Sequence, residues 1–156
     1  MSTRDESALP VGIGNGSGAG FTLAEMLIVV AVVALLATIA LPHYGDHVRR
    51  SRIVEATSRL ADHRVRLEQH FLDHRTYASD GACGVAVPAF DAAKEAFELT
   101  CAATASTYTV TATGRGTMAG FAYAINQSNA RATTAVPAGW TIAADCWVLR
   151  RDGSCL

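Results

Sequence analysis

The pattern of apolar and polar positions divides the chain into segments of different composition. Residues 1–17 are rich in Ser, Gly and Asn and cannot build a core, so this segment is expected to be disordered or removed. Residues 21–41 are apolar and uncharged except for Glu25. As an α-helix this run would measure roughly 31 Å, about the thickness of a bilayer core. We therefore predict a membrane-spanning helix here.

Residues 44–77 have the pattern of an amphipathic helix. Charges fill one face, and a stripe with one polar interruption recurs at spacings of three and four on the other, at Ile53, Ala56, Leu60, Arg64, Leu67 and Phe71. No glycine lies between Gly45 and Gly81, so residues 21–77 predict one long helix. Pro42 would remove one hydrogen bond and kink this helix rather than end it.

From Ala78 onward the chain is rich in Gly, Ala, Thr and Cys, and short stretches alternate like strands. FELTCA and STYTVTATG alternate as half-buried strands do, GRG at 114–116 indicates a turn, and GFAYAINQ is expected to return as the second strand of a hairpin. A short helical turn is expected at residues 88–96, and a last strand at CWVLR. The pattern predicts the α+β class, with a long N-terminal helix packed on a small antiparallel sheet.

Four cysteines, Cys83, Cys101, Cys146 and Cys155, follow the apolar run. An even number beyond a membrane-type segment favours two disulfides in an oxidising compartment. A zinc site would favour cysteines in close pairs, and no two of these are close in sequence. The residues alone leave three pairings open.

Glu25 is the feature of the apolar run that a membrane span does not explain. A charged side chain in the bilayer costs on the order of 2.5–3.5 kcal/mol on insertion scales and usually has a partner. If the chain were cut after Gly20, within the small-residue sequence GAG, Phe21 would carry a free α-amine one helical turn from Glu25.

The segment GFTLAEMLIVVAVVALLATIALPHY resembles the cleavage signal and N-terminal helix of type IV pilins. The resemblance implies that a prepilin peptidase cuts between Gly20 and Phe21 and methylates the new N-terminal Phe21. It also implies that Glu25 pairs with the Phe21 amine of a neighbouring subunit and helps set axial register in the filament core. Pro42 matches the proline at which the helix of the family can loosen in the filament.

The segments LEQHFLDHRTYA and CWVLRRDGSC are similar to a minor-pilin subgroup called pilin-E-like. That resemblance implies the disulfides Cys83–Cys101 and Cys146–Cys155, the second of which closes a C-terminal loop. The organisation expected for the chain is a leader, a hydrophobic helix, an amphipathic helix and a disulfide-containing domain, at residues 1–20, 21–42, 43–77 and 78–156.

As a pilin, the chain is expected to be a structural subunit with no enzymatic activity and no cofactor. Its expected partners are other pilin subunits, a prepilin peptidase, the inner-membrane assembly machinery and, before assembly, the membrane itself. The domain would lie in the periplasm first and in an extracellular pilus afterwards, serving twitching, adhesion or DNA uptake. The leader is less basic than leaders of the family, and Arg49, Arg50 and Arg52 follow the span, an order for which the positive-inside rule predicts the opposite orientation.

Two other functions remain open from the sequence. A type II secretion pseudopilin shares the N-terminal signature. An exported soluble binding domain would result if a conventional signal peptide were cleaved after TIA, at residues 38–40. The second alternative leaves Glu25 without a purpose, as does a plain single-span membrane protein.

The histidines are the remaining candidate ligands. His43 with His47, and His70 with His74, have the spacing that lets one helix face chelate a metal. No third ligand is forced nearby, so no metal site is predicted, and no catalytic arrangement of Ser or Cys with His can be argued.

Charge and aromatic residues give weak indications of nucleic-acid binding. The net charge is −1, so no global field attracts DNA. Residues 43–75 hold seven Arg against five acids, an excess that leaves a DNA contact uncertain. Trp140 and Trp147 are interpreted as core or loop anchors rather than as a binding cage.

Overall fold

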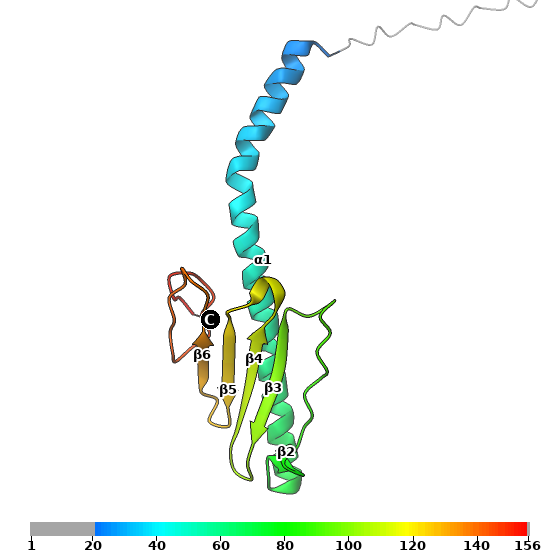
Figure 1. Cartoon of the computed structure of the whole chain (residues 1–156), viewed down its shortest axis with the longest axis vertical. Coiled ribbons are helices and arrows are strands. Elements are labelled where there is room, and N and C mark those ends of the chain that lie inside the picture. The colour runs from blue at the N-terminus through cyan, green and yellow to red at the C-terminus, as the bar shows by residue number, and fades with distance from the viewer. Residues whose placement is uncertain (1–20, 156) are drawn as a thin grey trace, which may run out of the picture. The chain divides into compact units, whose positions relative to one another are not determined.

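The computed structural model describes residues 21–155, and within that range the side chains of residues 39–43 lie outside the description. The chain divides into two compact units between Ala40 and Leu41, and each unit is described by itself. Helix α1 (Leu23–His74) has 52 residues and contributes to both (Figure 1). The long helix expected at residues 21–77 is therefore confirmed.

The first unit exposes its apolar side chains. Leu23, Leu27 and Leu35 are 78, 62 and 69 % exposed, and the aliphatic residues between them are exposed as well. Within the described part of the chain, no helix combines the length and the apolar character that crossing a membrane requires. The membrane-spanning segment at residues 21–42 stays a prediction, and residues 39–43 at its end include side chains outside the description.

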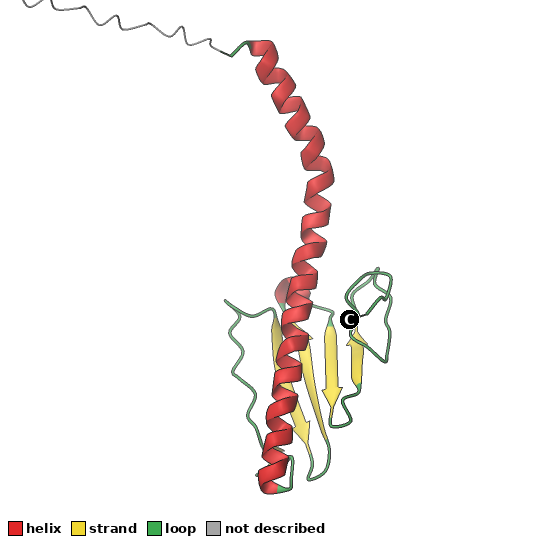
Figure 2. Ribbon diagram, turned by 180° about the vertical axis from the view of Figure 1, so that it is seen from behind, coloured by secondary structure: helices red, strands yellow, loops and turns green. Residues whose placement is uncertain are grey.

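The second unit contains a four-stranded antiparallel sheet in the order β3-β4-β5-β6. Its strands are β3 (Phe97–Ala103), β4 (Tyr108–Gly114), β5 (Ala122–Asn126) and β6 (Arg131–Ala135). A small hairpin of β1 (Ala78–Ser79) and β2 (Ala82–Cys83) precedes them. Figure 2 shows α1 lying across one face of the sheet, so the α+β class and the expected hairpin, here β4 and β5, are confirmed.

The core of this unit lies between α1 and the sheet. In β4, every second side chain faces α1, and Tyr108, Val110 and Ala112 are 2, 0 and 0 % exposed, as strand alternation requires. The helix contributes the buried residues Ile53, Ala56, Leu60, His63 and Leu67. The buried polar positions of the helix are Thr57 and His63. Arg64, expected to interrupt the stripe, is half-buried, and its Nε is enclosed without a hydrogen-bond partner.

One expectation for the C-terminal half differs from the structure. The strand expected at CWVLR is wrong, because only an isolated bridge joins Val148 to Cys155. The fourth strand is β6, whose short sequence RATTA carries no strong alternation. The short helical turn expected at residues 88–96 is present as a single turn, in which Glu95 donates its backbone N–H to the Asp91 carbonyl at 2.8 Å.

Two disulfides link distant parts of this unit. Cys83 is joined to Cys101, and Cys146 to Cys155, with Cα–Cα distances of 6.0 and 5.9 Å. The first bond ties the β1–β2 hairpin to the edge strand β3. The second closes a C-terminal loop, and both pairs are those that the family resemblance implies.

Candidate functional site: a basic surface at the C-terminal disulfide loop

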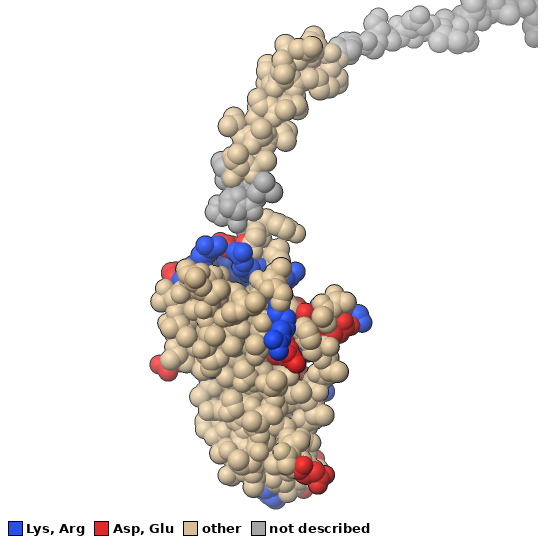
Figure 3. All heavy atoms as spheres, viewed as in Figure 1, with Lys and Arg blue, Asp and Glu red and all other residues tan. Residues whose placement is uncertain are grey.

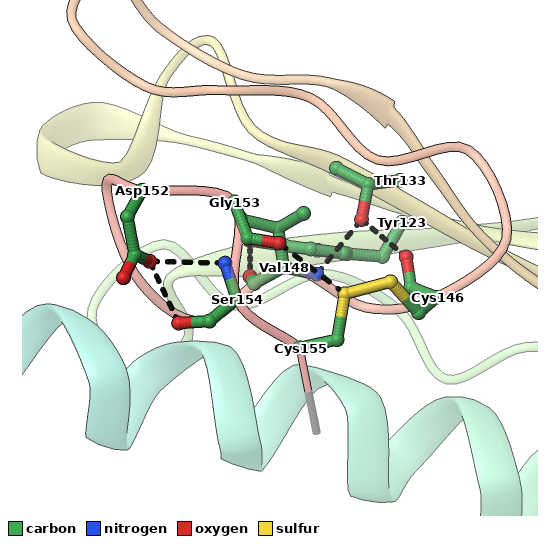
Figure 4. Close-up of a disulfide and its surroundings, with 8 residues drawn as sticks. All are labelled: Tyr123, Thr133, Cys146, Val148, Asp152, Gly153, Ser154 and Cys155. Atoms are coloured by element: carbon green, nitrogen blue, oxygen red, sulfur yellow. Dashed lines mark hydrogen bonds between the residues drawn. A yellow bond between two sulfur atoms is a disulfide. The ribbon is translucent and has the colours of Figure 1, made fainter.

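The C-terminal disulfide loop, residues 146–155, is held to the sheet by side-chain hydrogen bonds. Thr133 on β6 donates its hydroxyl to the Cys146 carbonyl at 2.6 Å and accepts the Val148 N–H at 2.9 Å. Tyr123 on β5 donates its hydroxyl to the Val148 carbonyl at 3.0 Å (Figure 4). Burial raises the pKa of Tyr123, so this hydroxyl stays protonated and remains a donor. The base of the loop is thereby fixed without a strand ladder.

The outer end of the loop is a tight turn that projects two arginines. Asp152 accepts hydrogen bonds from the backbone N–H and the hydroxyl of Ser154 at 3.0 and 2.7 Å, and these bonds lower the pKa of its carboxyl group. Gly153 has a φ of +86°, a conformation that costs other residues strain, and donates its N–H to the Arg150 carbonyl at 3.1 Å. Arg150 and Arg151 therefore lie on an ordered turn.

The same turn meets helix α1 through an ion pair. Arg151 contacts Asp46 at 3.2 Å, and Asp46 also contacts Arg49 at 3.0 Å. Hydrogen bonding to Arg151 is the main reason why the pKa of Asp46 lies below its usual value. One carboxylate thus aligns arginines from two segments that are distant in sequence.

We call this region the basic surface: Arg49, Arg50, Arg150 and Arg151, with Asp46 and Asp152 as its acids. Figure 3 shows Lys and Arg side chains gathered at one end of the domain, whereas much of the visible face is uncharged. Among the described residues, Asp46 is the ion-pair partner of two of these arginines, and no carboxylate pairs with Arg50 or Arg150. The surface therefore has a local excess of positive charge that the net charge of the chain conceals.

A hollow of about 250 Å³ opens within the basic surface. Its walls come from α1, from the loop after β6 and from the C-terminal disulfide loop, and its lining residues are Asp46, Arg50, Trp140, Leu149, Arg150, Arg151 and Asp152. Cationic, aromatic and aliphatic groups thus meet in one place.

A second hollow, of about 350 Å³, has a different electrostatic character. Its cations are already engaged: Arg115 with Glu98, Lys94 with Asp91, and Arg52 with the Thr117 hydroxyl. Because two of these cations pair with carboxylates and the third already donates to a hydroxyl, that hollow is a weaker candidate for an anionic ligand.

The start of α1 places the residues expected to act in assembly close together. Thr22 caps the helix, since its hydroxyl accepts the Glu25 N–H at 3.2 Å and its carbonyl accepts the Met26 N–H at 3.1 Å. Glu25 is therefore in the first turn, where the helix dipole favours a carboxylate. Phe21 is 70 % exposed, and Gly20 lies outside the described residues.

Pro42 lies within the bounds of α1, so the helix does not end there. Its side chain is outside the described residues, and the kink expected at this position stays a prediction.

The comparisons with known proteins identify the family of the chain. The family model described as "Type IV minor pilin ComP, DNA uptake sequence receptor" matches residues 42–122. The chain belongs to this family. The resemblance to type IV pilins is thereby confirmed.

Curated relatives of this minor pilin are pilins and fimbrial proteins. The type IV major pilin protein PilE1 of Neisseria gonorrhoeae is 38 % identical over 46 % of this chain and 34 % of its own length. Fimbrial protein EcpC of Eikenella corrodens is 38 % identical over 40 % of this chain and 41 % of its own. Type IV major fimbrial protein FimA of Dichelobacter nodosus is 38 % identical over 41 % of this chain and 35 % of its own. The minor pilin therefore spans less than half the length of the curated relatives it matches. No solved structure is similar enough to the chain to count as a match.

Of the two histidine pairs, His70 and His74 can be placed, whereas the side chain of His43 lies outside the described residues. His70 and His74 stack with ring centroids 4.2 Å apart. The His70 ring also lies directly against Gly84, where an added Cβ would stand 2.2 Å from it, and its Nδ1 hydrogen-bonds the Thr76 carbonyl at 2.9 Å. Among the described residues, no three His, Cys, Asp or Glu side chains are grouped as a metal site requires.

Two buried polar features of the minor pilin were not predicted from its sequence. His63 is 3 % exposed with no partner at Nε2, and burial lowers its pKa. Glu68 accepts hydrogen bonds from the hydroxyls of Tyr77 and Tyr108 at 3.0 and 2.9 Å. For His63 a pattern existed, since it lies three residues after Leu60 and continues the buried stripe. The convergence of both tyrosines on Glu68 depends on tertiary structure alone.

Proposed function

We propose that this minor pilin is a DNA-uptake subunit of a type IV pilus and that it contacts DNA through the basic surface. The observation that carries the proposal is that arginines from α1 and from the C-terminal disulfide loop meet on one surface with few acids. Phosphates attract such clusters, and neutralising them releases counterions. The description of the matched family as a DNA uptake sequence receptor supports the same function.

The assembly pathway we propose begins in the inner membrane. The prepilin is inserted there, a prepilin peptidase cuts between Gly20 and Phe21, and Phe21 is methylated. Glu25 then pairs with the Phe21 amine of a neighbouring subunit, which removes both charges from the apolar filament core. Pro42 marks the position at which the helix loosens during packing. The exposed apolar side chains of the first unit support this pathway, because none of the residues that the structure describes covers them.

The domain is proposed to face the periplasm before assembly. The positive-inside rule predicts the reverse for Arg49, Arg50 and Arg52, but both disulfides belong to the domain and form in an oxidising compartment. Because disulfides form in oxidising compartments and flanking charges only bias insertion, the two disulfides support a periplasmic domain.

Binding of a labelled DNA duplex by the full-length chain in detergent, followed by fluorescence anisotropy over a salt series, tests the DNA contact. The Arg50→Ala/Arg150→Ala double variant should bind about 10-fold more weakly or worse at physiological salt, and its log–log salt slope should fall by about 2. Arg66→Ala/Arg115→Ala is the matched control, since it removes the same charge from arginines that pair with Asp62 and Glu98. Equal losses in both double variants would refute a localised site.

The assembly pathway has its own test in Glu25→Ala. The variant should be inserted and cleaved normally but recovered poorly in sheared filaments, as measured by immunoblot. Glu55→Ala, which removes an exposed carboxylate from the second half of the same helix, is the control. Normal incorporation of the Glu25 variant would contradict the proposed pairing.

A further inference from the structure

The hollow in the basic surface has an apolar wall that phosphate binding does not require. Trp140 is half-buried and stands edge-to-face against Phe121, with ring centroids 4.8 Å apart and an interplanar angle of 89°. Leu149, also half-buried, lines the same hollow. A site that served phosphates alone would need only the arginines.

Comparison with Trp147 shows that Trp140 makes fewer contacts within the domain. Trp147 is 5 % exposed, donates its indole N–H to the Ala124 carbonyl at 3.0 Å, and carries the Arg131 guanidinium 4.8 Å from its ring. In the described structure, no residue accepts a hydrogen bond from the Trp140 indole. Trp147 is an anchor, as expected from the sequence, whereas part of the Trp140 ring remains available on the hollow.

The size and the charge of the hollow restrict what fits. At about 250 Å³ it is smaller than the ~300–1,000 Å³ of sites for drug-sized ligands, which leaves room for one planar heterocycle. Arg50 and Arg150 both line it, and neither pairs with a carboxylate in the described part of the chain. An aromatic wall beside unpaired arginines matches a planar base that carries a phosphate.

We propose that this hollow binds one unpaired nucleobase of single-stranded DNA, stacked on Trp140, with the adjoining phosphate between Arg50 and Arg150. The inference rests on the proposed DNA-binding function and adds a preference for unpaired strands. Bases inside a duplex are stacked on one another and cannot enter, whereas frayed ends and single strands offer a free face. Stacking on an aromatic ring is the usual way in which proteins hold such bases without reading their sequence.

Three DNA probes and two Trp140 variants test this preference with the full-length chain in detergent. The probes are an oligothymidylate, an abasic strand of equal length, and a hairpin duplex with closed ends. Trp140→Ala should weaken oligothymidylate binding by about 5–150-fold, the range that one stacking contact supplies. It should leave binding of the abasic strand and of the hairpin unchanged. Trp140→Phe keeps an aromatic ring and the contact with Phe121, so it should restore most of the affinity.

Tryptophan fluorescence gives a second readout that does not depend on affinity. Oligothymidylate should quench part of the emission of the wild type, and this quenching should vanish in Trp140→Phe, because the remaining Trp147 is buried. Thymidine monophosphate should bind the same hollow and quench the same part of the emission, but only at higher concentration.

The outcomes separate this inference from the proposed function. If Trp140→Ala binds all three probes as the wild type does, while Arg50→Ala/Arg150→Ala binds none, DNA is held by phosphates alone and the stacking site is refuted. If the wild type binds no probe, the proposed function itself fails. Should Trp140→Ala be unfolded by circular dichroism, Trp140→Phe decides, since unchanged quenching in that variant also overturns the inference.

Discussion

The two parts of helix α1 have opposite relations to the rest of the chain. In the first unit, Leu35 is 69 % exposed, whereas Leu60 in the second unit is 0 % exposed against the sheet. Both belong to one unbroken helix, so helix propensity does not distinguish them. What differs is the location of the partners: those of Leu60 lie within the domain, whereas none of the described residues covers Leu35, whose partners we propose to be lipid and neighbouring subunits. A pilin needs both kinds of residue, because its fold and its assembly are separate requirements.

A matched pair of leucine truncations tests this comparison most directly. Leu60→Ala should lower the free energy of unfolding of the domain by about 2–5 kcal/mol, because it removes a buried side chain and leaves a cavity. Leu35→Ala should leave the unfolding of the domain unchanged. Guanidinium unfolding in detergent, followed by the circular dichroism of the sheet, measures both. Equal destabilisation by the two variants would show that the first part of α1 also supports the domain.

Glu68 extends the test to a polar contact within the second unit. Its carboxylate accepts hydrogen bonds from both Tyr77 and Tyr108, and these hydroxyls join the helix end, the segment after it and β4. Glu68→Gln places an amide N–H₂ against one hydroxyl and should cost about 1–3 kcal/mol of stability. Glu55→Gln, on the exposed face of the same helix, serves as the control in the same unfolding assay. No difference between the two would mean that water replaces the lost acceptor.

His63 makes the second unit sensitive to pH. Burial is the main cause that lowers its pKa from the ordinary 6.5, and Arg66 lowers it further, while Asp62 and the Val85 carbonyl act in the opposite direction. Because the unfolded chain binds the proton more readily, stability should be complete above pH ~6.5 and fall as the pH drops below that value.

The measurement for His63 is the midpoint of thermal unfolding as a function of pH. His63→Leu should reduce the fall of the unfolding midpoint between neutral and mildly acidic pH, whatever its effect on the midpoint at pH 7. His47→Leu, a substitution of an exposed histidine in the same helix, should keep the slope of the wild type. An unchanged slope in His63→Leu would show that the decline comes from titratable groups other than His63.

The sequence predicted those features that local periodicity determines. The spacing of Ile53, Ala56 and Leu60 indicated the buried stripe, and the alternation of residues 108–112 indicated β4. Prediction failed where tertiary contacts decide. The apolar run around Val148 resembled a strand in the sequence. In the structure this segment is held by the Thr133 and Tyr123 side chains rather than by a strand ladder, and no local pattern indicates such contacts.

The candidate site shows the same division. Residues 43–75 indicated only a weak excess of arginine, because half of the basic surface comes from Arg150 and Arg151, far along the chain. Only the fold brings them beside Asp46. In contrast, the sequence alone places Phe21 and Glu25 four residues apart at the start of the helix, and their pairing between neighbouring subunits stays a prediction.

Substitution of Asp46 is expected to have the smallest effect. Asp46 combines features of the two kinds of residue compared above, those with partners within the chain and those with partners in other molecules. Its carboxylate is satisfied within the chain by Arg49 and Arg151, yet it lies in the surface proposed for an external partner. Exposed ion pairs add little to stability, so Asp46→Asn should leave the unfolding midpoint unchanged. It should raise DNA affinity a few-fold and steepen the salt slope by about 1, because an arginine is released toward phosphate.

The anisotropy titration used for the arginine variants measures the effect of Asp46→Asn, with Asp62→Asn as the control for lost negative charge. Asp62 pairs with Arg66 on the same helix, and Arg66 is not part of the basic surface. If Asp46→Asn bound DNA more weakly than the wild type, the ion pair with Arg151 would be needed to hold the C-terminal disulfide loop in its binding position. Asp46 would then belong with Leu60, as a residue whose role is fulfilled within the chain.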